Sequence, residues 1–114
     1  MKEFTGKVLK VIDGDTMDCI IDLGFDISIR KRVRLHGIDT PEVNDSDHSM
    51  RGQAIEARIK VEQLLKAKPG RVNFIYHGDG KYGRPLMEVL IGETNLNKFL
   101  VSEGYAKEYF GGKR

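Results

Sequence analysis

Two short acidic turns are the first features of this sequence that could do chemistry. They are Asp13-Gly14-Asp15-Thr16 and Asp39-Thr40-Pro41-Glu42. Hard divalent cations prefer carboxylate and carbonyl oxygens as ligands. Asp-Gly and Thr-Pro are also ordinary turn formers, so either turn alone has a purely structural interpretation. An EF-hand is excluded, because its loop needs glycine at the sixth position and glutamate at the twelfth, where this chain has Asp18 and Gly24.

Two arginines accompany these turns. Arg34 precedes Asp39 in the chain, and Arg84 lies in another tight turn, Lys81-Tyr82-Gly83-Arg84-Pro85. The fixed fork of a guanidinium group suits the oxygens of a phosphodiester and the negative charge that builds on them during attack. Acids for a hard metal ion and arginines for phosphate are the groups that metal-assisted phosphodiester hydrolysis requires. Each arginine alone is more often a solvated surface residue, so the spacing leaves open whether these groups meet.

Strands are predicted on both sides of the first acidic turn. Residues 7–12 and 16–23 are β-rich runs, and Gly24-Phe25-Asp26 offers a turn before a third strand at 27–35. The third strand alternates, with apolar residues on one face and arginines on the other. The apolar residues are Ile27, Ile29, Val33 and Leu35, and the arginines are Arg30, Arg32 and Arg34. Lys31 breaks the apolar row, which indicates an edge or the rim of a barrel.

The second half of the chain alternates helices and strands. A helix is predicted from about Gly52 to Pro69-Gly70, capped by Asp47 or Ser49. Its apolar face consists of Ala54, Ala57, Val61, Leu64 and Leu65. Strands at 72–76 and 86–91 flank a Gly-rich turn.

A second, short helix follows these strands. Thr94 or Asn95 caps its start and Gly104 suits its end. The order is therefore three strands, a helix, two strands and a helix. This order favours a mainly β, α+β domain, a small antiparallel barrel with two packed helices, and the five-stranded oligonucleotide-binding (OB) barrel is one such architecture. We expect a single domain over residues 1–114.

The composition is ordinary for a globular domain and excludes few functions. The chain of 114 residues has a net charge of +2, which is compatible with nucleic acid without being specific for it. No apolar run approaches the ~20 residues of a membrane helix. Residues 1–6 lack the apolar stretch of a secretory signal. We expect a monomeric, cytoplasmic protein without membrane contact, or a secreted protein if a signal has been removed.

The single cysteine and the three histidines are interpreted as structural residues, not as catalytic or metal-binding ones. Cys19 is the single cysteine and lies in an apolar run, so we predict a buried, inert thiol rather than a nucleophile. His36, His48 and His77 are scattered along the chain and do not form a ligand-spaced cluster with cysteines or carboxylates. They therefore give little support for a zinc site.

Three motifs together resemble those of the staphylococcal nuclease homologues in their order and approximate spacing. They are Val11-Ile12-Asp13-Gly14-Asp15-Thr16, Arg34-Leu35-His36-Gly37-Ile38-Asp39-Thr40-Pro41-Glu42 and Lys81-Tyr82-Gly83-Arg84. Residues 100–107 resemble the second helix of that family and the segment after it, so the resemblance covers nearly the whole chain. The chain lacks the third C-terminal helix of the family's best-known member. We expect it to be less stable than the longer homologues for that reason.

The resemblance implies an OB barrel and a calcium-dependent endonuclease. Such an enzyme cleaves DNA and/or RNA, prefers single-stranded stretches and leaves 3′-phosphate ends. Asp15 and Asp39 would bind Ca²⁺ through their carboxylates and Thr40 through its backbone carbonyl, with Asp13 as an outer-sphere partner. Glu42 would orient or deprotonate the attacking water.

The resemblance also implies phosphate-binding roles. Arg34 and Arg84 would hold the scissile phosphate and stabilise the pentacovalent transition state. Lys81 and Tyr82 match residues that contact the terminal phosphate of the nucleotide, although both are equally compatible with a plain turn. Tyr109 could stack on a base.

Phe110 could also stack on a base. It stands where the best-known member has a tyrosine, so a hydroxyl contact is not expected there. A core or rim position is an equally good interpretation for both neighbouring aromatic residues.

Two alternatives to an active nuclease remain at this level. Related barrels in multidomain RNA-binding proteins have lost their catalytic groups and only hold nucleic acid or partner chains. A metal-stabilised structural protein would bind calcium without cleaving anything. The presence of Arg34, Glu42 and Arg84 beside Asp15 and Asp39 favours the enzyme.

Overall fold

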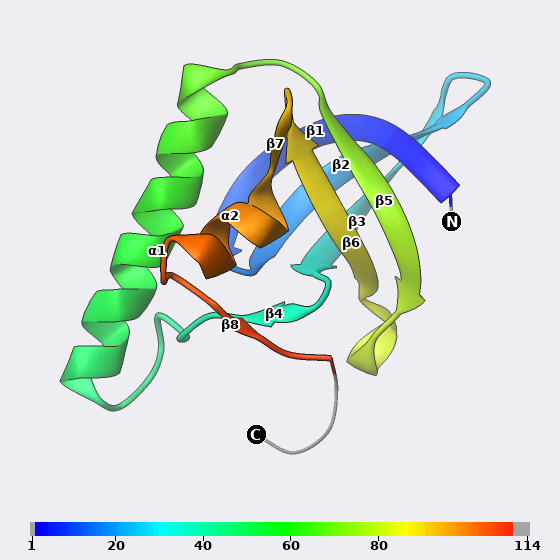
Figure 1. Ribbon diagram of the computed structural model, residues 1–114. Helices are drawn as coiled ribbons and strands as arrows, with labels where there is room; N and C mark the ends of the chain where they lie inside the picture. Colours follow the sequence, from blue (N-terminus) through cyan, green and yellow to red (C-terminus); the bar gives the residue numbers. More distant parts are fainter. Residues whose placement is uncertain (1, 111–114) are drawn as a thin grey trace.

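Five strands form a closed barrel in the computed structural model, which describes residues 2–110 (Figure 1). They are β1 (Lys2–Asp13), β2 (Thr16–Gly24), β3 (Ile27–Leu35), β5 (Val72–Asp79) and β6 (Pro85–Ile91). Their order is β3-β2-β1-β5-β6, and neighbours in this order are antiparallel. A short parallel pairing of β3 with β6, in which Arg34 lies opposite Leu86, closes the barrel. The predicted five-stranded barrel is confirmed.

One row of apolar side chains from each strand fills the barrel. Met17 of β2 pairs with Val33 of β3, and neither side chain is accessible to solvent. Ile27 and Ile29 continue the same row but are 56% and 36% exposed. The reason is visible in Figure 1, where the β2–β3 hairpin projects beyond the barrel, so that its end has no facing layer. Alternation predicted the face of these residues correctly but could not show where the covering layer ends.

Helix α1 (His48–Ala67) packs along one side of the barrel (Figure 1). It begins four residues earlier than predicted, because Asp47 is the N-cap and accepts hydrogen bonds from the backbone N–H groups of Ser49 and Met50. Ala54, Ala57 and Val61 are its buried residues. Such small residues allow the helix to approach the barrel closely.

The first acidic turn lies against this helix. A side chain at Gly14 would place its Cβ 2.9 Å from the Cβ of Ala57 and 3.1 Å from Cγ2 of Thr40. Only a residue without a side chain fits between these neighbours. Gly14 therefore lets the turn from β1 to β2 sit beside both α1 and the second acidic turn.

Helix α2 (Leu96–Ser102) is tied to the barrel by one buried polar side chain. Asn95 caps the helix by accepting a hydrogen bond from Lys98 N. The Asn97 side chain accepts a hydrogen bond from Val89 N and donates to the carbonyl oxygens of His36 and Met87. This contact joins α2 both to β6 and to the segment that follows β3.

The segment after β3 is not the simple exit from the sheet that the sequence suggested. Ile38–Asp39 forms β4, which pairs with β8 (Lys107–Glu108) as a separate two-stranded sheet. Figure 1 shows the chain after α2 returning to lie beside β4. A short strand, β7 (Thr94–Asn95), and a 3₁₀ turn, η1 (Lys81–Gly83), complete the elements.

No helix among residues 2–110 is long and apolar enough to cross a membrane. The basic end of the aromatic tail, residues 111–114, lies outside the described residues.

Candidate active site

The carboxylate of Asp15 is the point where the two acidic turns meet. Asp15 is only 3% exposed. Its Oδ2 accepts hydrogen bonds from Arg34 Nη1 at 2.7 Å and from the backbone N of Thr40 at 3.0 Å. Its Oδ1 accepts a hydrogen bond from Thr16 Oγ1 at 3.0 Å. The turn between β1 and β2, the end of β3 and the segment after β4 therefore converge at one side chain.

Arg34 bridges the two candidate metal-binding carboxylates. Its Nη2 donates to Asp39 Oδ1 at 3.2 Å and to the carbonyl oxygen of Ile38 at 3.3 Å, while Nη1 donates to Asp15. Burial disfavours the charged guanidinium, but the two carboxylates outweigh this effect and raise the pKa of Arg34 above its usual value. The arginine is therefore a fixed, permanent positive charge at the end of β3.

Asp13 holds the loop that carries Glu42. Its Oδ1 accepts a hydrogen bond from Val43 N at 2.9 Å. The carbonyl oxygen of Glu42 accepts from Asp45 N at 3.1 Å. The backbone of this loop is thus held on both sides of Glu42, while its side chain is exposed. This arrangement leaves the Glu42 carboxylate near Thr40 in the chain and open to water.

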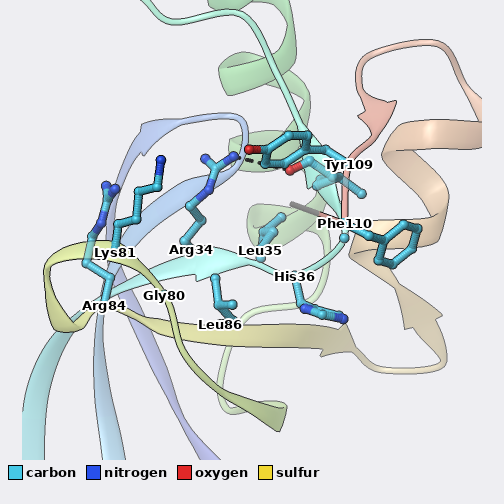
Figure 2. A pocket seen from close by; sticks show the side chains of 11 residues that line it. Arg34, Leu35, His36, Gly80, Lys81, Arg84, Leu86, Tyr109 and Phe110 are labelled. Carbon is cyan, nitrogen blue, oxygen red and sulfur yellow. Dashed lines mark hydrogen bonds between the residues drawn. The ribbon is translucent and has the colours of Figure 1, made fainter. Parts of the chain in front are cut away.

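A pocket of about 410 Å³ lies beside Arg34, between the end of β3, the η1 turn and the chain after α2. Figure 2 shows that the cations lining it project toward the same side. Four of the predicted site residues line it: Arg34, Lys81, Arg84 and Tyr109. The η1 turn is fixed by a hydrogen bond from Gly80 N to the carbonyl oxygen of Arg84 at 2.7 Å. Nε of Arg84 is buried and has no hydrogen-bond partner within residues 2–110.

The aromatic residues of the site fall into two groups. Tyr82 does not line the pocket. It is 93% exposed, and the guanidinium carbon of Arg84 lies 5.9 Å from the centre of its ring. Tyr109 lines the pocket, and its backbone N donates to the carbonyl oxygen of Gly37 at 2.8 Å. Phe110 also lines the pocket and is 73% exposed. Of the two predicted substrate-binding tyrosines, Tyr109 therefore lies at the pocket and Tyr82 lies outside it.

His36, which lines the pocket, belongs to a histidine pair that sequence reasoning missed. The rings of His36 and His77 stack at 4.0 Å with an angle of 6° between their planes. His77 Nε2 lies 2.8 Å from Glu88 Oε1, and Asn95 donates to Glu88 Oε2 at 2.7 Å. Burial, followed by the neighbouring His77, lowers the pKa of His36. No local signal could have revealed the pair, because it forms only when the barrel brings β3 and β5 to the same end.

The chemistry of the donors at Asp15 and Asp39 fits a hard cation. Both carboxylates contact the guanidinium group of Arg34. Thr40 follows Asp39 in the chain, and its backbone N donates to Asp15. Oγ1 of Thr40 is buried without a hydrogen-bond partner in the described chain. No group of three or more His, Cys, Asp or Glu side chains among residues 2–110 could hold a metal ion. An ion here would therefore need carbonyl oxygens and water in addition to carboxylates, which is typical of calcium rather than zinc.

Most of this chain is similar to one known protein family. The family model described as "Staphylococcal nuclease homologue" matches residues 32–114. The chain belongs to this family. Asp13 and Asp15 precede the matched segment, but they contact it directly through Val43, Arg34 and Thr40.

Individual relatives agree with the family assignment. The chain is 32% identical over 108 residues to the thermonuclease of Staphylococcus hyicus, covering 95% of this chain and 61% of that protein. It is 36% identical over 104 residues to the thermonuclease of Staphylococcus intermedius, covering 90% and 58%. It is 30% identical over 120 residues to the micrococcal nuclease of Shigella flexneri, covering 96% and 62%. The chain therefore spans about three fifths of the length of these relatives.

Proposed function

We propose that this staphylococcal nuclease homologue is a calcium-dependent endonuclease that hydrolyses phosphodiester bonds of DNA and/or RNA and leaves 3′-phosphate ends. The observation that carries the proposal is the continuous network from Asp15 through Arg34 to Asp39 at the edge of a cationic pocket. The names of the relatives, thermonuclease and micrococcal nuclease, point to the same class of reaction.

The metal-binding groups would be Asp15, Asp39 and the backbone carbonyl of Thr40. A calcium ion held there would supply Lewis-acid stabilisation of the charge on the phosphate. Asp13 would be an outer-sphere partner of the ion, because its carboxylate already accepts a hydrogen bond from Val43 N in the loop after the second acidic turn.

The arginines would recognise the phosphate. Arg34 and Arg84 reach the same pocket from β3 and from the η1 turn. Their guanidinium groups would donate hydrogen bonds to the non-bridging oxygens, which gain negative charge in the pentacovalent transition state. Donors placed in advance at this position lower the barrier because they interact more strongly with the transition state than with the substrate.

Glu42 would act as the general base for the attacking water. Its exposed carboxylate lies on the loop after Thr40 and would accept the proton as the water oxygen forms its bond to phosphorus. The bond from phosphorus to the 5′ oxygen then breaks, and this oxygen takes a proton from solvent. The phosphate stays on the 3′ oxygen, which accounts for the proposed product.

Lys81 and Tyr109 would bind the rest of the nucleotide. The Lys81 ammonium group lines the pocket beside the arginines and would neutralise a neighbouring phosphate. Tyr109 would stack on a base, as aromatic side chains do in proteins that bind single strands. This need for an unstacked base is the reason to expect a preference for single-stranded substrate.

The test is cleavage of a fluorescently labelled single-stranded DNA by the wild-type protein and by Glu42→Gln, each with calcium and with EDTA. Glu93→Gln, which changes an exposed carboxylate after β6 in the same way, is the matched control. We expect calcium-dependent cleavage that EDTA abolishes, that Glu42→Gln lowers at least about a hundredfold, and that Glu93→Gln leaves intact. Mass spectrometry of the products should show 3′-phosphate ends. Binding of the oligonucleotide without cleavage by folded wild-type protein would instead identify a non-catalytic binding module.

A further inference from the structure

The outer face of β3 carries a row of three arginines that ends in the candidate active site. Arg30, Arg32 and Arg34 lie opposite Ile20, Asp18 and Thr16 of β2. Val33, between Arg32 and Arg34, points inward, since it and its partner Met17 are fully buried. Arg30, Arg32 and Arg34, hereafter the arginine row, thus share one face of the sheet, and Arg34 is its inner end.

Each of the two arginines nearest the site is held by an aspartate from β2 or from the turn before it. Arg34 pairs with Asp15 at 2.7 Å. Arg32 makes two hydrogen bonds with Asp18, Nε to Oδ1 at 2.9 Å and Nη2 to Oδ2 at 3.3 Å. Arg30 also lies 3.9 Å from Asp18. One carboxylate is therefore shared between two guanidinium groups, which leaves the outer part of the row positively charged.

The surroundings of the row add to this charge. The side chains of Arg30 and Arg32 are 68% and 51% exposed. On β1, the exposed Lys10 lies opposite Asp18, and the exposed Lys7 lies opposite Ile20.

The next acid along β2 does not cancel this charge. Asp22, opposite Ser28 of β3, has its own cation, because Arg71 lies 3.9 Å away. The face between the active site and the projecting hairpin is therefore cationic. Ile20, which is 37% exposed, offers an apolar contact within it.

The spacing of the row suits an extended single strand. Alternate residues of a β-strand are about 6.6 Å apart along the strand, which is close to the repeat of phosphates in an extended polynucleotide. In a duplex, the phosphates of each strand advance only about 3.4 Å per nucleotide along the axis. The phosphates of a duplex also follow a curved path around that axis, whereas a single strand can extend along a straight row, so the row suits a single strand.

We propose that the arginine row is a binding track that extends the active site, with Arg32 and Arg30 binding successive phosphates of a single-stranded polynucleotide beyond the phosphate at Arg34. Asp18 is a positioning residue for Arg32, as Asp15 is for Arg34 in the absence of substrate. The proposal rests on the proposed nuclease function, because the phosphate at Arg34 is the one cleaved. It implies that substrates longer than a dinucleotide gain additional binding energy from Arg32 and Arg30.

The first test is binding, which needs neither metal nor cleavage. Fluorescence anisotropy with a labelled thymidine dodecanucleotide in EDTA compares the wild-type protein with Arg30→Gln, in which an exposed cation is lost. Lys66→Gln, an equally exposed cation in the last turn of α1, is the matched control. We expect Arg30→Gln to weaken binding about fivefold at 0.1 M salt and to reduce the slope of log K against log salt by about 0.7, the contribution of one phosphate. Equal affinities and slopes for Arg30→Gln and Lys66→Gln would overturn the proposal.

The second test separates the track from the catalytic centre. Values of kcat/KM with calcium are measured for a thymidine dinucleotide and for the dodecanucleotide. We expect the loss caused by Arg30→Gln to be at least about threefold greater for the dodecanucleotide, because only that substrate is long enough to reach Arg32 and Arg30. Equal losses on both substrates would overturn the track. Absence of cleavage by the wild-type protein would contradict the proposed nuclease function alone, because the anisotropy experiment measures binding to the arginine row without cleavage.

Discussion

Asn97 offers a quantitative test of how α2 supports the site. It is 4% exposed, and its side chain makes three hydrogen bonds to the backbone of β6 and of the segment after β3. The perturbation is Asn97→Ala, which removes all three bonds. Val89 N–H, His36 C=O and Met87 C=O would then each lose a partner at a position that water reaches poorly.

The magnitude follows from these contacts. A net contribution of about 1 kcal/mol per hydrogen bond gives a loss of about 3 kcal/mol in the free energy of unfolding. The better helix propensity of alanine stabilises the variant by roughly 0.5 kcal/mol, so we expect the free energy of unfolding to fall by about 2.5 kcal/mol in total. With a urea m-value of about 1–2 kcal/mol/M for a domain of this size, the unfolding midpoint should fall by roughly 1.3–2.5 M.

The assay is urea unfolding followed by circular dichroism, with two comparison variants. Asn73→Ala changes an exposed asparagine on β5 and should move the midpoint little. Asn97→Asp keeps an oxygen for Val89 N but sets a second oxygen against two carbonyls, so it should destabilise the protein at least as much as alanine does. If Asn97→Ala shifts the midpoint no further than Asn73→Ala, the view that this side chain anchors the segment between β3 and β4 is wrong.

Three further predictions concern catalysis, pH and thiol reactivity. Arg84→Ala should fold and bind calcium but cleave at least about a hundredfold more slowly; turnover near that of the wild type would remove Arg84 from the site. The lowered pKa of His36 means that its contribution to stability is present above about pH 6.5 and is lost as the pH falls from there toward the folded-state pKa. The free energy of urea unfolding should therefore drop less between pH 7.5 and 5.5 in His36→Gln than in the wild type, and an unchanged drop would contradict the assignment. Burial, with a smaller contribution from Asp18, raises the pKa of the Cys19 thiol to about 12, so iodoacetamide at pH 8 should label the protein only after unfolding; rapid labelling of the native state would refute the buried, inert thiol.

The local sequence determined the elements and the faces of the barrel strands. Alternation in β3 separated Val33 and Leu35 from the arginines because successive side chains of a strand point to opposite faces. The helix starts were readable from Asp47 and Asn95, because an N-cap acts on backbone groups within its own first turn. The order of the motifs also pointed to the family. These features depend on residues that are near one another in the chain.

The tertiary structure alone decided which of these elements meet. Arg34 joins Asp15 to Asp39 because β3 pairs with β2 and the second acidic turn folds back onto the first. The His36–His77 stack depends on barrel closure in the same way.

The exposed β2–β3 hairpin also shows what the sequence pattern could not predict. Ile27 has the pattern of a core residue, yet no layer covers it. Hydrophobic periodicity reports the side of a strand and carries no information about what packs against that side. The local pattern thus supplied the chemical groups of the candidate site, and long-range strand pairing placed Asp15 and Arg34 within hydrogen-bonding distance, because the barrel brings residues distant in the chain together.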